Sequence, residues 1–266
     1  MVGNSQQLIG VWQLPVDYER YAAALLKTER TSRMNIVTFA STKGGVGKST
    51  SAAIFVDSLI RSGQTVRALD FDDQGNFRKW VTGVAPRFLN LTFSEIEGRK
   101  DAGFLHYYNA LVELFEDETD WVVMDTKGTD DPRQPAALAI SDLVIAPSGP
   151  IENELAGVSK ITEYLRLALK QSDPDVDPLD ILRVLYRQPA GFVDRMMAIQ
   201  REVLFEHFGV ISEIHYSGAL GSFLGHRKST DEVIADMKAQ KLSITPLHRV
   251  QEAADRLVAN IKEATE

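Results

Sequence analysis

The sequence predicts a three-layer α/β fold in which helices cover both faces of a doubly wound, mostly parallel sheet. From Met34 onward, short β-branched runs alternate with segments of helical periodicity, as such folds require. The chain has 266 residues, 44% of them hydrophobic, which suits one large domain better than two. A glycine-rich loop follows the first apolar run, and sheets of this kind bind ligands where their strands end.

The predicted domain spans residues 34–266, and residues 1–33 form a separate N-terminal arm. Tyrosines and leucines within residues 18–26 give this arm one short helix with an apolar edge, while its flanks show no periodic pattern. The arm is too short for a helix-turn-helix domain. Because Met34 directly precedes the first expected strand, the alternative that the arm results from an upstream start stays open.

Strands and helices are expected in alternation along the domain. The buried strands are expected at residues 36–39, 66–69, 121–124, 143–146 and 181–185. Amphipathic helices are expected at residues 48–61, 104–115, 151–170, 192–208, 230–239 and 246–264. In the segment 151–170, apolar residues recur every three or four positions, which is the period of one helix face.

Composition excludes several classes of protein. The chain has no cysteine, so disulfides, cysteine-ligated zinc and iron–sulfur clusters are ruled out. No apolar run approaches the ~20 residues of a membrane span, and the first residues lack the plan of a signal peptide, so a cytoplasmic protein is expected. The formal net charge of -8 argues against a protein coated in nucleic acid, although it leaves local positive patches open.

The stretch STKGGVGKST is the strongest motif, and it holds two lysines where a phosphate-binding loop needs one. The usual pattern, G-x-x-x-x-G-K-[ST], is completed by Gly47, Lys48 and Ser49, but Thr42 stands at its first glycine. A predicted strand precedes the loop and a predicted helix follows it, so backbone N–H groups would face a polyphosphate. Lys48 would reach the β- and γ-phosphates, and Ser49 would bind Mg²⁺. The expected nucleotide-binding residues are Lys43, Gly44, Gly45, Val46, Gly47, Lys48, Ser49 and Thr50.

KGGVGKST resembles the deviant Walker A motif of the ParA/MinD ATPases, which are P-loop NTPases distinguished by the early lysine. The resemblance implies ATP and Mg²⁺ as cofactors and a homodimer that encloses the nucleotides. It also implies that Lys43 crosses the dimer and contacts the phosphates of the partner's ATP. Taken without the rest of the motif, Lys43 would be interpreted as a solvated loop lysine.

A second stretch, ALDFDDQGN, is similar to the segment that follows the second strand in this family. Asp70 and Asp72 match its two aspartates, and Asp73 stands where proline is usual. The resemblance implies that Asp72 positions or activates the attacking water and that Asp70 lies near Mg²⁺ and Lys48. Both carboxylates follow an apolar strand, where α/β sheets place their ligands.

A third stretch, WVVMDTKGTDD, resembles the Walker B strand, whose terminal aspartate binds Mg²⁺ through water. Asp125 takes that position, which makes Ser49, Asp70 and Asp125 the expected metal site. The family usually has prolines next, whereas this chain has Thr126-Lys127-Gly128, and the pattern assigns no role to Lys127. The base-contacting segment of the family corresponds to YRQPAG here, which identifies no adenine contact.

The resemblance covers residue 34 to about residue 260 and is strongest up to Pro147. It implies an ATPase that dimerises with ATP, associates with the nucleoid by binding DNA nonspecifically, and is released when a ParB-like or cargo-adaptor protein stimulates hydrolysis. Thr42 favours plasmid or cargo partition over cell division. The acidic residues flanking the expected C-terminal helix argue against membrane binding. Candidate DNA contacts in the less acidic C-terminal third are Arg195, Arg201, Arg227 and Lys228.

Two alternatives stay open at the level of the sequence. LVIAPSGPIENE and VLYRQPAG are similar to ParA relatives of conjugative DNA transfer, so the protein could recruit a DNA-transfer complex instead. Ligases of the dethiobiotin-synthetase type and cobyrinate amidases share the loop and the fold, and they consume ATP on a small substrate. A switch would hydrolyse ATP slowly alone and faster with DNA and a partner protein.

Overall fold

The computed structural model describes the domain predicted from Met34 onward, with short gaps. The described residues are 34–99, 102–114, 119–128, 131–172, 174–189, 191, 193–215 and 217–265. The predicted N-terminal arm, residues 1–33, lies outside them.

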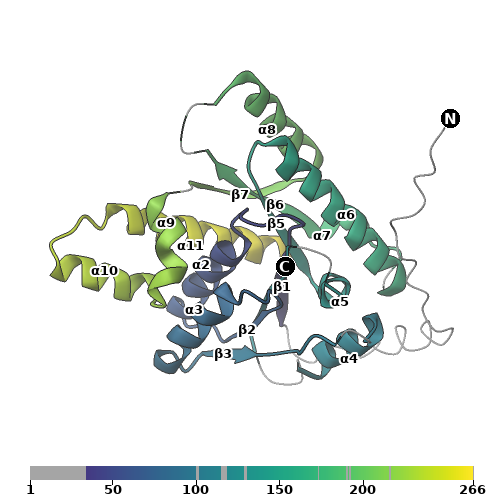
Figure 1. Cartoon of the computed structure of the whole chain (residues 1–266), viewed down its shortest axis with the longest axis horizontal. Helices are drawn as coiled ribbons and strands as arrows, with labels where there is room; N and C mark the ends of the chain where they lie inside the picture. Colours follow the sequence, from purple (N-terminus) through teal and green to yellow (C-terminus); the bar gives the residue numbers. More distant parts are fainter. Residues whose placement is uncertain are drawn as a thin grey trace. The chain divides into compact units, whose positions relative to one another are not determined.

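Seven parallel strands form one sheet in the order β3-β2-β4-β1-β5-β6-β7 (Figure 1). The first strand along the chain is therefore the central one, and the later strands add to both of its sides. This is the doubly wound arrangement that the alternating pattern predicts. The strands are β1 (Asn35–Phe39), β2 (Val66–Asp70), β3 (Leu91–Ser94), β4 (Trp121–Asp125), β5 (Leu143–Ser148), β6 (Leu182–Gln188) and β7 (Val210–His215).

All the predicted strands are confirmed, and the two edge strands β3 and β7 are additional. Only Leu91 is buried in β3, and in β7 only Ser212 and Ile214 are buried. A short strand with little buried surface leaves a weak signal in the sequence, because hydrophobic periodicity records burial. Edge strands are the least buried strands of a parallel sheet, and they are the ones that the pattern missed.

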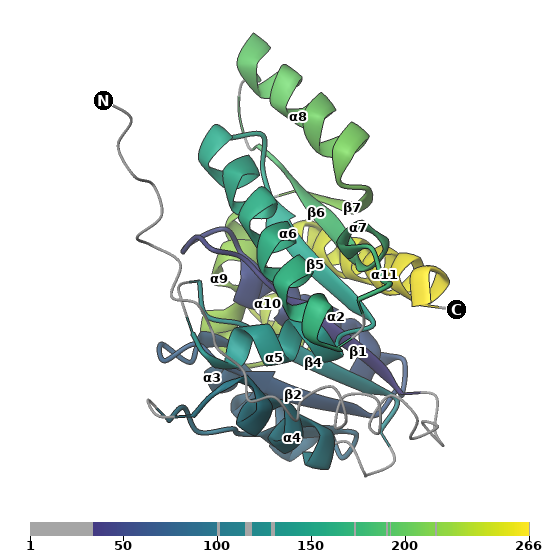
Figure 2. The same ribbon diagram turned by 90° about the vertical axis from the view of Figure 1, so that its right-hand side faces the viewer.

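Two layers of helices enclose the sheet (Figure 1, Figure 2). One face packs against α2 (Lys48–Arg61), α3 (Asn76–Val84), α9 (Gly218–His226) and α11 (Thr245–Thr265). The other face packs against α5 (Arg133–Ile140), α6 (Glu152–Ser172) and α8 (Arg195–His207), with α4 (Phe104–Leu114) beside α5. The remaining helices are η1 (Ala85–Arg87), α7 (Pro178–Ile181) and α10 (Thr230–Ala239). Within the described residues, no helix combines the length and the apolar character needed to cross a bilayer.

The predicted helices are confirmed with small shifts at their ends, whereas α3, α5, α7 and α9 are additional. Each of these four helices is short and contains glycine or proline, which lower helix propensity. Tertiary packing forms them instead: Trp80 of α3 and Phe223 of α9 are fully buried against each other, with ring centroids 5.4 Å apart.

The helix α2 is anchored in the core of the domain. Its residues from Ser51 to Ile60 are all buried. Phe55 lies between Phe39 of β1 and Trp121 of β4, with ring centroids 5.8 and 5.6 Å away. Tilted and edge-on aromatic pairs of this kind add to the stability that apolar burial provides. The core therefore fixes the helix that begins at the glycine-rich loop.

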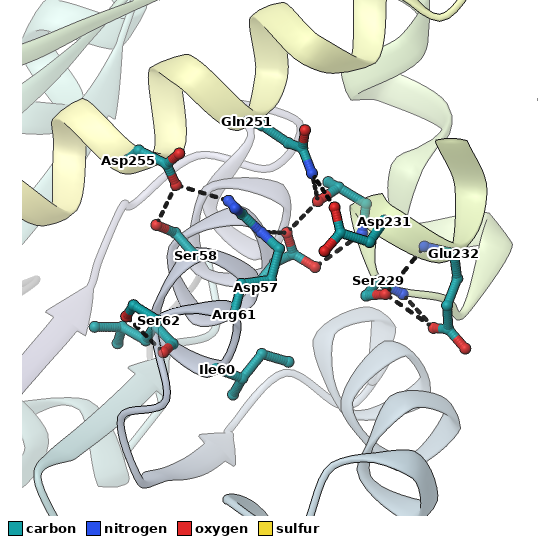
Figure 3. A network of polar contacts seen from close by, with 12 residues as sticks. Asp57, Ser58, Ile60, Arg61, Ser62, Ser229, Asp231, Glu232, Gln251 and Asp255 are labelled. Atoms are coloured by element: carbon teal, nitrogen blue, oxygen red, sulfur yellow. Dashed lines mark hydrogen bonds and ion pairs between the residues drawn. The ribbon is translucent and has the colours of Figure 1, made fainter. Parts of the chain in front are cut away.

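A polar network ties α2 to the two C-terminal helices (Figure 3). Asp57, fully buried in the middle of α2, accepts hydrogen bonds from the backbone N–H (2.9 Å) and the hydroxyl (2.5 Å) of Thr230, and from Arg61 Nε (3.0 Å). Arg61 and Ser58 in turn donate to Asp255 of α11, at 2.7 and 2.6 Å. Each carboxylate in this network has hydrogen-bond donors, which is the usual condition for a polar group in a core.

Candidate active site

The register of the sheet places three strand ends side by side. Asp125, at the end of β4, is paired with Asp70 of β2 on one side and with Phe39 of β1 on the other. The loops that follow these strands therefore leave the sheet at one edge. The structure thus brings together the glycine-rich loop, the Asp70–Asp72 segment and the end of the Walker-B-like strand, as the motifs predict.

The glycine-rich loop has the backbone of an anion-binding loop. Gly45 (φ 78°) and Gly47 (φ 89°) both lie in the left-handed region, which glycine adopts without steric cost. Val46 is buried between them and anchors the loop, while Lys43 and Gly44 are exposed. Gly47 caps α2 without any side-chain hydrogen bond, so the first N–H groups of the helix are left to a ligand.

Lys48 opens α2 and lies beside Asp125. Its side chain is buried, with only 6% of the residue exposed, and its charge lowers the pKa of Asp125. Ser49 and Thr50 follow in the first helical turn and are half-buried. The predicted loop residues thus form a continuous segment at the amino end of a buried helix, which is the location that a polyphosphate requires.

Asp125 carries the clearest functional signal in the structure. It is fully buried, and neither carboxylate oxygen has a hydrogen-bond partner among the described residues. Burial raises its pKa to about 7, and the charges of Asp70 and Asp72 act in the same direction. Lys48 opposes this shift, as does the nearby Ser49 hydroxyl, which lies outside hydrogen-bond geometry. An unpaired buried carboxylate is costly and is typical of a site that awaits a cation.

Magnesium fits the oxygen atoms at this edge. Among the described residues, no group of three or more histidine or acidic side chains could hold a metal ion alone. Mg²⁺ usually keeps several waters and takes further ligands from phosphates, so a complete protein cage is not needed. Asp125 and the Ser49 hydroxyl would hold the ion, directly or through water. A bound Mg²⁺ would neutralise charge on the phosphates of a nucleotide.

Asp70 and Asp72 differ in what they contact. The two carboxylate oxygens of Asp70 accept hydrogen bonds from the backbone N–H groups of Asp72 (2.8 Å) and Arg78 (2.7 Å). Asp70 therefore fixes the loop after β2 and the start of α3, and a role at the metal stays a prediction. Asp72 is half-buried and accepts a hydrogen bond from the backbone N–H of Gln74 at 3.0 Å. Its position near Asp125 is compatible with the predicted role in orienting water.

An ion pair beside the loop was not predicted from the sequence. Arg187, at the end of β6, passes next to the loop: a Cβ atom placed on Gly47 would lie 3.5 Å from its Cδ. Its guanidinium donates to Glu154 of α6 at 2.5 Å, and Glu154 also accepts a 2.5 Å hydrogen bond from the N–H of Gly149. The arginine within VLYRQPAG was the only available signal, and it did not indicate a partner.

The candidate DNA contacts fall into two groups. Arg201 is paired with Glu213 at 3.3 Å and stacks on Phe205, and Lys228 is paired with Asp236 at 2.5 Å. Arg195 and Arg227 are exposed. A cation that is already paired with a carboxylate attracts a phosphate backbone less strongly. Of the four candidate DNA contacts, only Arg195 and Arg227 are therefore readily available to DNA.

A family model described as the CobQ/CobB/MinD/ParA nucleotide binding domain matches residues 37–241. No curated protein sequence matches. Among solved structures, an ATP complex of a McdA variant from Cyanothece has a TM-score of 0.62 at 14% identity, covering 86% of this chain and 97% of that chain.

Two further structures are similar at the same level. A plasmid partition protein from Borrelia burgdorferi has a TM-score of 0.53 at 19% identity, covering 79% of this chain and 100% of that chain. The cell division protein MinD from Aquifex aeolicus has a TM-score of 0.59 at 15% identity, covering 86% of this chain and 97% of that chain. Likeness at these identities supports the fold, and the family model covers most of the chain. The chain therefore belongs to the CobQ/CobB/MinD/ParA nucleotide-binding domain family, with the ParA/MinD form of the α/β fold.

Proposed function

We propose that the protein is a ParA-type ATPase that dimerises around ATP, binds DNA nonspecifically and is released when a partner protein stimulates hydrolysis. Such a cycle would move a plasmid, another DNA or a protein cargo over the nucleoid. The observation that carries the proposal is Asp125, a buried carboxylate without hydrogen-bond donors beside a glycine-rich loop and Lys48. A cation with a polyphosphate would neutralise this site.

Each residue of the site has a distinct task in the proposed hydrolysis. The N–H groups of the loop and the Lys48 ammonium bind the phosphates of ATP and hold them in line for attack. Asp125 and Ser49 hold Mg²⁺. Asp72 orients the attacking water and accepts its proton as the water oxygen bonds to the γ-phosphorus; the bond from that phosphorus to the bridging oxygen breaks, and ADP leaves. Lys43 supplies positive charge to the nucleotide of the other subunit.

The exposure of Lys43 favours a dimerising switch over a metabolic enzyme. The family model includes CobQ and CobB as well as MinD and ParA, so membership alone does not separate these classes. Lys43 is exposed, and its Cγ lies next to Gly157 of α6, where a Cβ atom would be 3.5 Å away. A lysine held at the rim of the loop can reach a second subunit.

The α10–α11 hairpin supports the DNA-binding part of the proposal. Residues 237–251 contain Lys238, Lys241 and Arg249 and no acidic residue, although the whole chain has a formal net charge of -8. These three residues are exposed, and none forms an ion pair with another described residue. A phosphate backbone attracts an unpaired cluster of this kind irrespective of base sequence.

The two lysines of the loop provide the test of the proposed cycle. Lys48→Ala removes a phosphate contact within the subunit, so ATP binding, dimerisation and DNA binding should all be lost. Lys43→Ala should still bind ATP as a monomer and fail to pair, which light scattering with a fluorescent ATP analogue would detect. A Lys43→Ala protein that dimerises normally with ATP would contradict the proposal and favour a metabolic ATPase.

DNA binding is tested by its dependence on nucleotide and salt. DNA affinity should require ATP, and it should fall steeply as the salt concentration rises. Replacing Lys238, Lys241 and Arg249 by alanine should lower the slope of log K against log salt by about 3, one unit for each lost phosphate contact. The control replaces Arg166 and Lys170 of α6, on the other face of the sheet. Equal affinity in ADP and ATP would count against the switch.

A further inference from the structure

We propose that Lys127 is a positioning residue for hydrolysis, because its ion pair with Asp73 holds the loop that carries Asp72 against the phosphate loop. The inference rests on the proposed function and adds a residue to it. Asp73 and Lys127 both stand where prolines are usual in the ParA/MinD ATPases, and in the structure they contact each other. The Lys127 ammonium lies 2.5 Å from an oxygen of Asp73.

The Asp72 loop is internally rigid. The Phe71 N–H donates to the Asp125 carbonyl at 2.9 Å and extends the ladder between β2 and β4 by one residue. Asp72 donates its N–H to the Asp70 carboxylate, and its own carbonyl accepts the N–H of Gly75 at 2.8 Å. The bond from Phe71 fixes the start of the loop to β4, and the two bonds of Asp72 lie within the loop itself. Asp72 therefore moves with its loop, and contacts beyond Phe71 decide where the loop lies.

The segment that carries Lys127 is attached to the end of β1 and lies against the phosphate loop. The N–H and the hydroxyl of Thr126 both donate to the carbonyl of Phe39, at 3.1 and 3.2 Å. Gly128 packs on the loop itself, because a Cβ atom there would lie 3.1 Å from the carbonyl oxygen of Lys43. Lys127 stands between these two anchors. It therefore joins the backbone beneath Lys43 to the loop that presents Asp72.

Other contacts at this edge hold different parts of the loop. Arg133 lies 3.8 Å from Asp73, but it is bound more closely to Asp131 at 2.7 Å and to the carbonyls of Phe71 and Ile96 at 2.7 and 3.1 Å. The hydrogen bond from Lys127 holds the pKa of Asp73 below its usual range, so Asp73 is ionised near neutral pH. Lys127 is thus the closest cation of the described residues to this carboxylate.

Solvent exposure sets the size of the expected effect. The Lys127 side chain is 31% exposed and the Asp73 side chain is 67% exposed, so water and salt weaken their attraction. Pairs of this kind change a rate by up to about five-fold. The KM for Mg·ATP should stay unchanged, because Lys48 and the loop N–H groups are untouched.

A double-mutant cycle on the full chain tests the pair. Lys127→Met and Asp73→Asn should each lower kcat about three- to five-fold, and the double variant should be no slower than either single variant. Lys127→Arg should keep most of the rate, and the exchanged pair Lys127→Asp with Asp73→Lys should recover part of it. Asp236→Asn is the matched control, since it breaks another exposed 2.5 Å Lys–Asp pair far from the loop and should leave kcat unchanged.

Several results would overturn the inference. Additive losses in the double variant, an unchanged kcat in Lys127→Met, or a loss confined to KM would each show that the pair does not position the Asp72 loop. Failure of the exchanged pair to exceed Lys127→Asp alone would do the same. An unmodified protein that never hydrolyses ATP, with or without DNA, would overturn the proposed function as well, whereas the other results leave it standing.

Discussion

Two buried aspartates show how differently this chain treats a carboxylate. Asp57, in the middle of α2, accepts hydrogen bonds from Thr230 and Arg61, whereas Asp125, at the end of β4, has no donor among the described residues. Both are fully buried, so burial alone does not separate them. The difference lies in their partners. A satisfied buried carboxylate joins parts of the fold, and an unsatisfied one indicates a ligand.

The location of each aspartate explains the difference. Asp57 faces the amino end of α10, where N–H groups and a threonine hydroxyl are available as donors. Asp125 lies at an edge where neighbouring strands also end in Asp70 and Phe39, so the chain brings further negative charge and few donors to it. Electrostatic repulsion at this edge is a cost that a bound cation would remove.

The largest expected effect on stability comes from Asp57. Asp57→Ala leaves the Thr230 N–H, the Thr230 hydroxyl and Arg61 Nε without an acceptor, and should lower the free energy of unfolding by about 3 kcal/mol. Urea denaturation would measure the loss. Asp255→Ala is the control, because that acceptor is 53% exposed and its loss should cost less than about 1 kcal/mol. A loss below 1 kcal/mol in Asp57→Ala would remove the distinction between the two regions.

Asp72→Ala should lower the rate of hydrolysis strongly and leave stability almost unchanged, whereas Asp57→Ala mainly lowers stability. Hydrolysis should fall by a factor on the order of 10², the scale for losing a positioned base, while the free energy of unfolding changes by less than about 0.5 kcal/mol. The variant should bind ATP, dimerise and stay on DNA. Gln74→Ala is the control, because only the backbone N–H of Gln74 contacts Asp72. A variant that hydrolyses ATP at the normal rate would exclude Asp72 as the water-orienting group.

Asp125→Asn should change the stability of the nucleotide-free protein by less than Asp57→Ala does, and in the opposite direction. Without nucleotide, the variant should be more stable than the parent protein by about 1 kcal/mol at pH 8, because an unpaired buried charge is gone. Burial raises the pKa of Asp125 to about 7, so the parent loses stability as the pH rises from about 4 to about 7, and the variant does not. Mg·ATP should stabilise the parent more than the variant. A destabilised variant at pH 8 would show that Asp125 has a structural role.

Much of the fold could be predicted from the sequence because burial leaves a periodic pattern. The central strands and the long helices carry that pattern, and their bounds are confirmed to within a few residues. The edge strands β3 and β7 bury too little to show it, and the short helices α5 and α9 contain proline or glycine. Such elements form because the rest of the domain is already in place.

The site could be predicted only in part. The motifs locate the loop, Lys48 and the three aspartates, since each lies next to a recognisable strand or glycine pattern. The pair of Asp73 and Lys127 depends on β2 and β4 being neighbours, which holds although β3 lies between them in the chain. No local pattern in the sequence records that adjacency. The same applies to Glu154 and Arg187, which come from α6 and β6.

The helix α2 has a mechanical consequence for the proposed cycle. It carries the phosphate loop at one end, and Asp57 lies nine residues farther on, about 14 Å along the axis at the rise of an α-helix. Because the helix is buried along most of its length, it is rigid, and its polar side chains form hydrogen bonds to α10 and α11. If a bound nucleotide tilts the helix at the loop, the rigid helix would transmit that tilt to the residues near its carboxyl end. The α10–α11 hairpin, which contains Lys238, Lys241 and Arg249, is bonded to that half of α2.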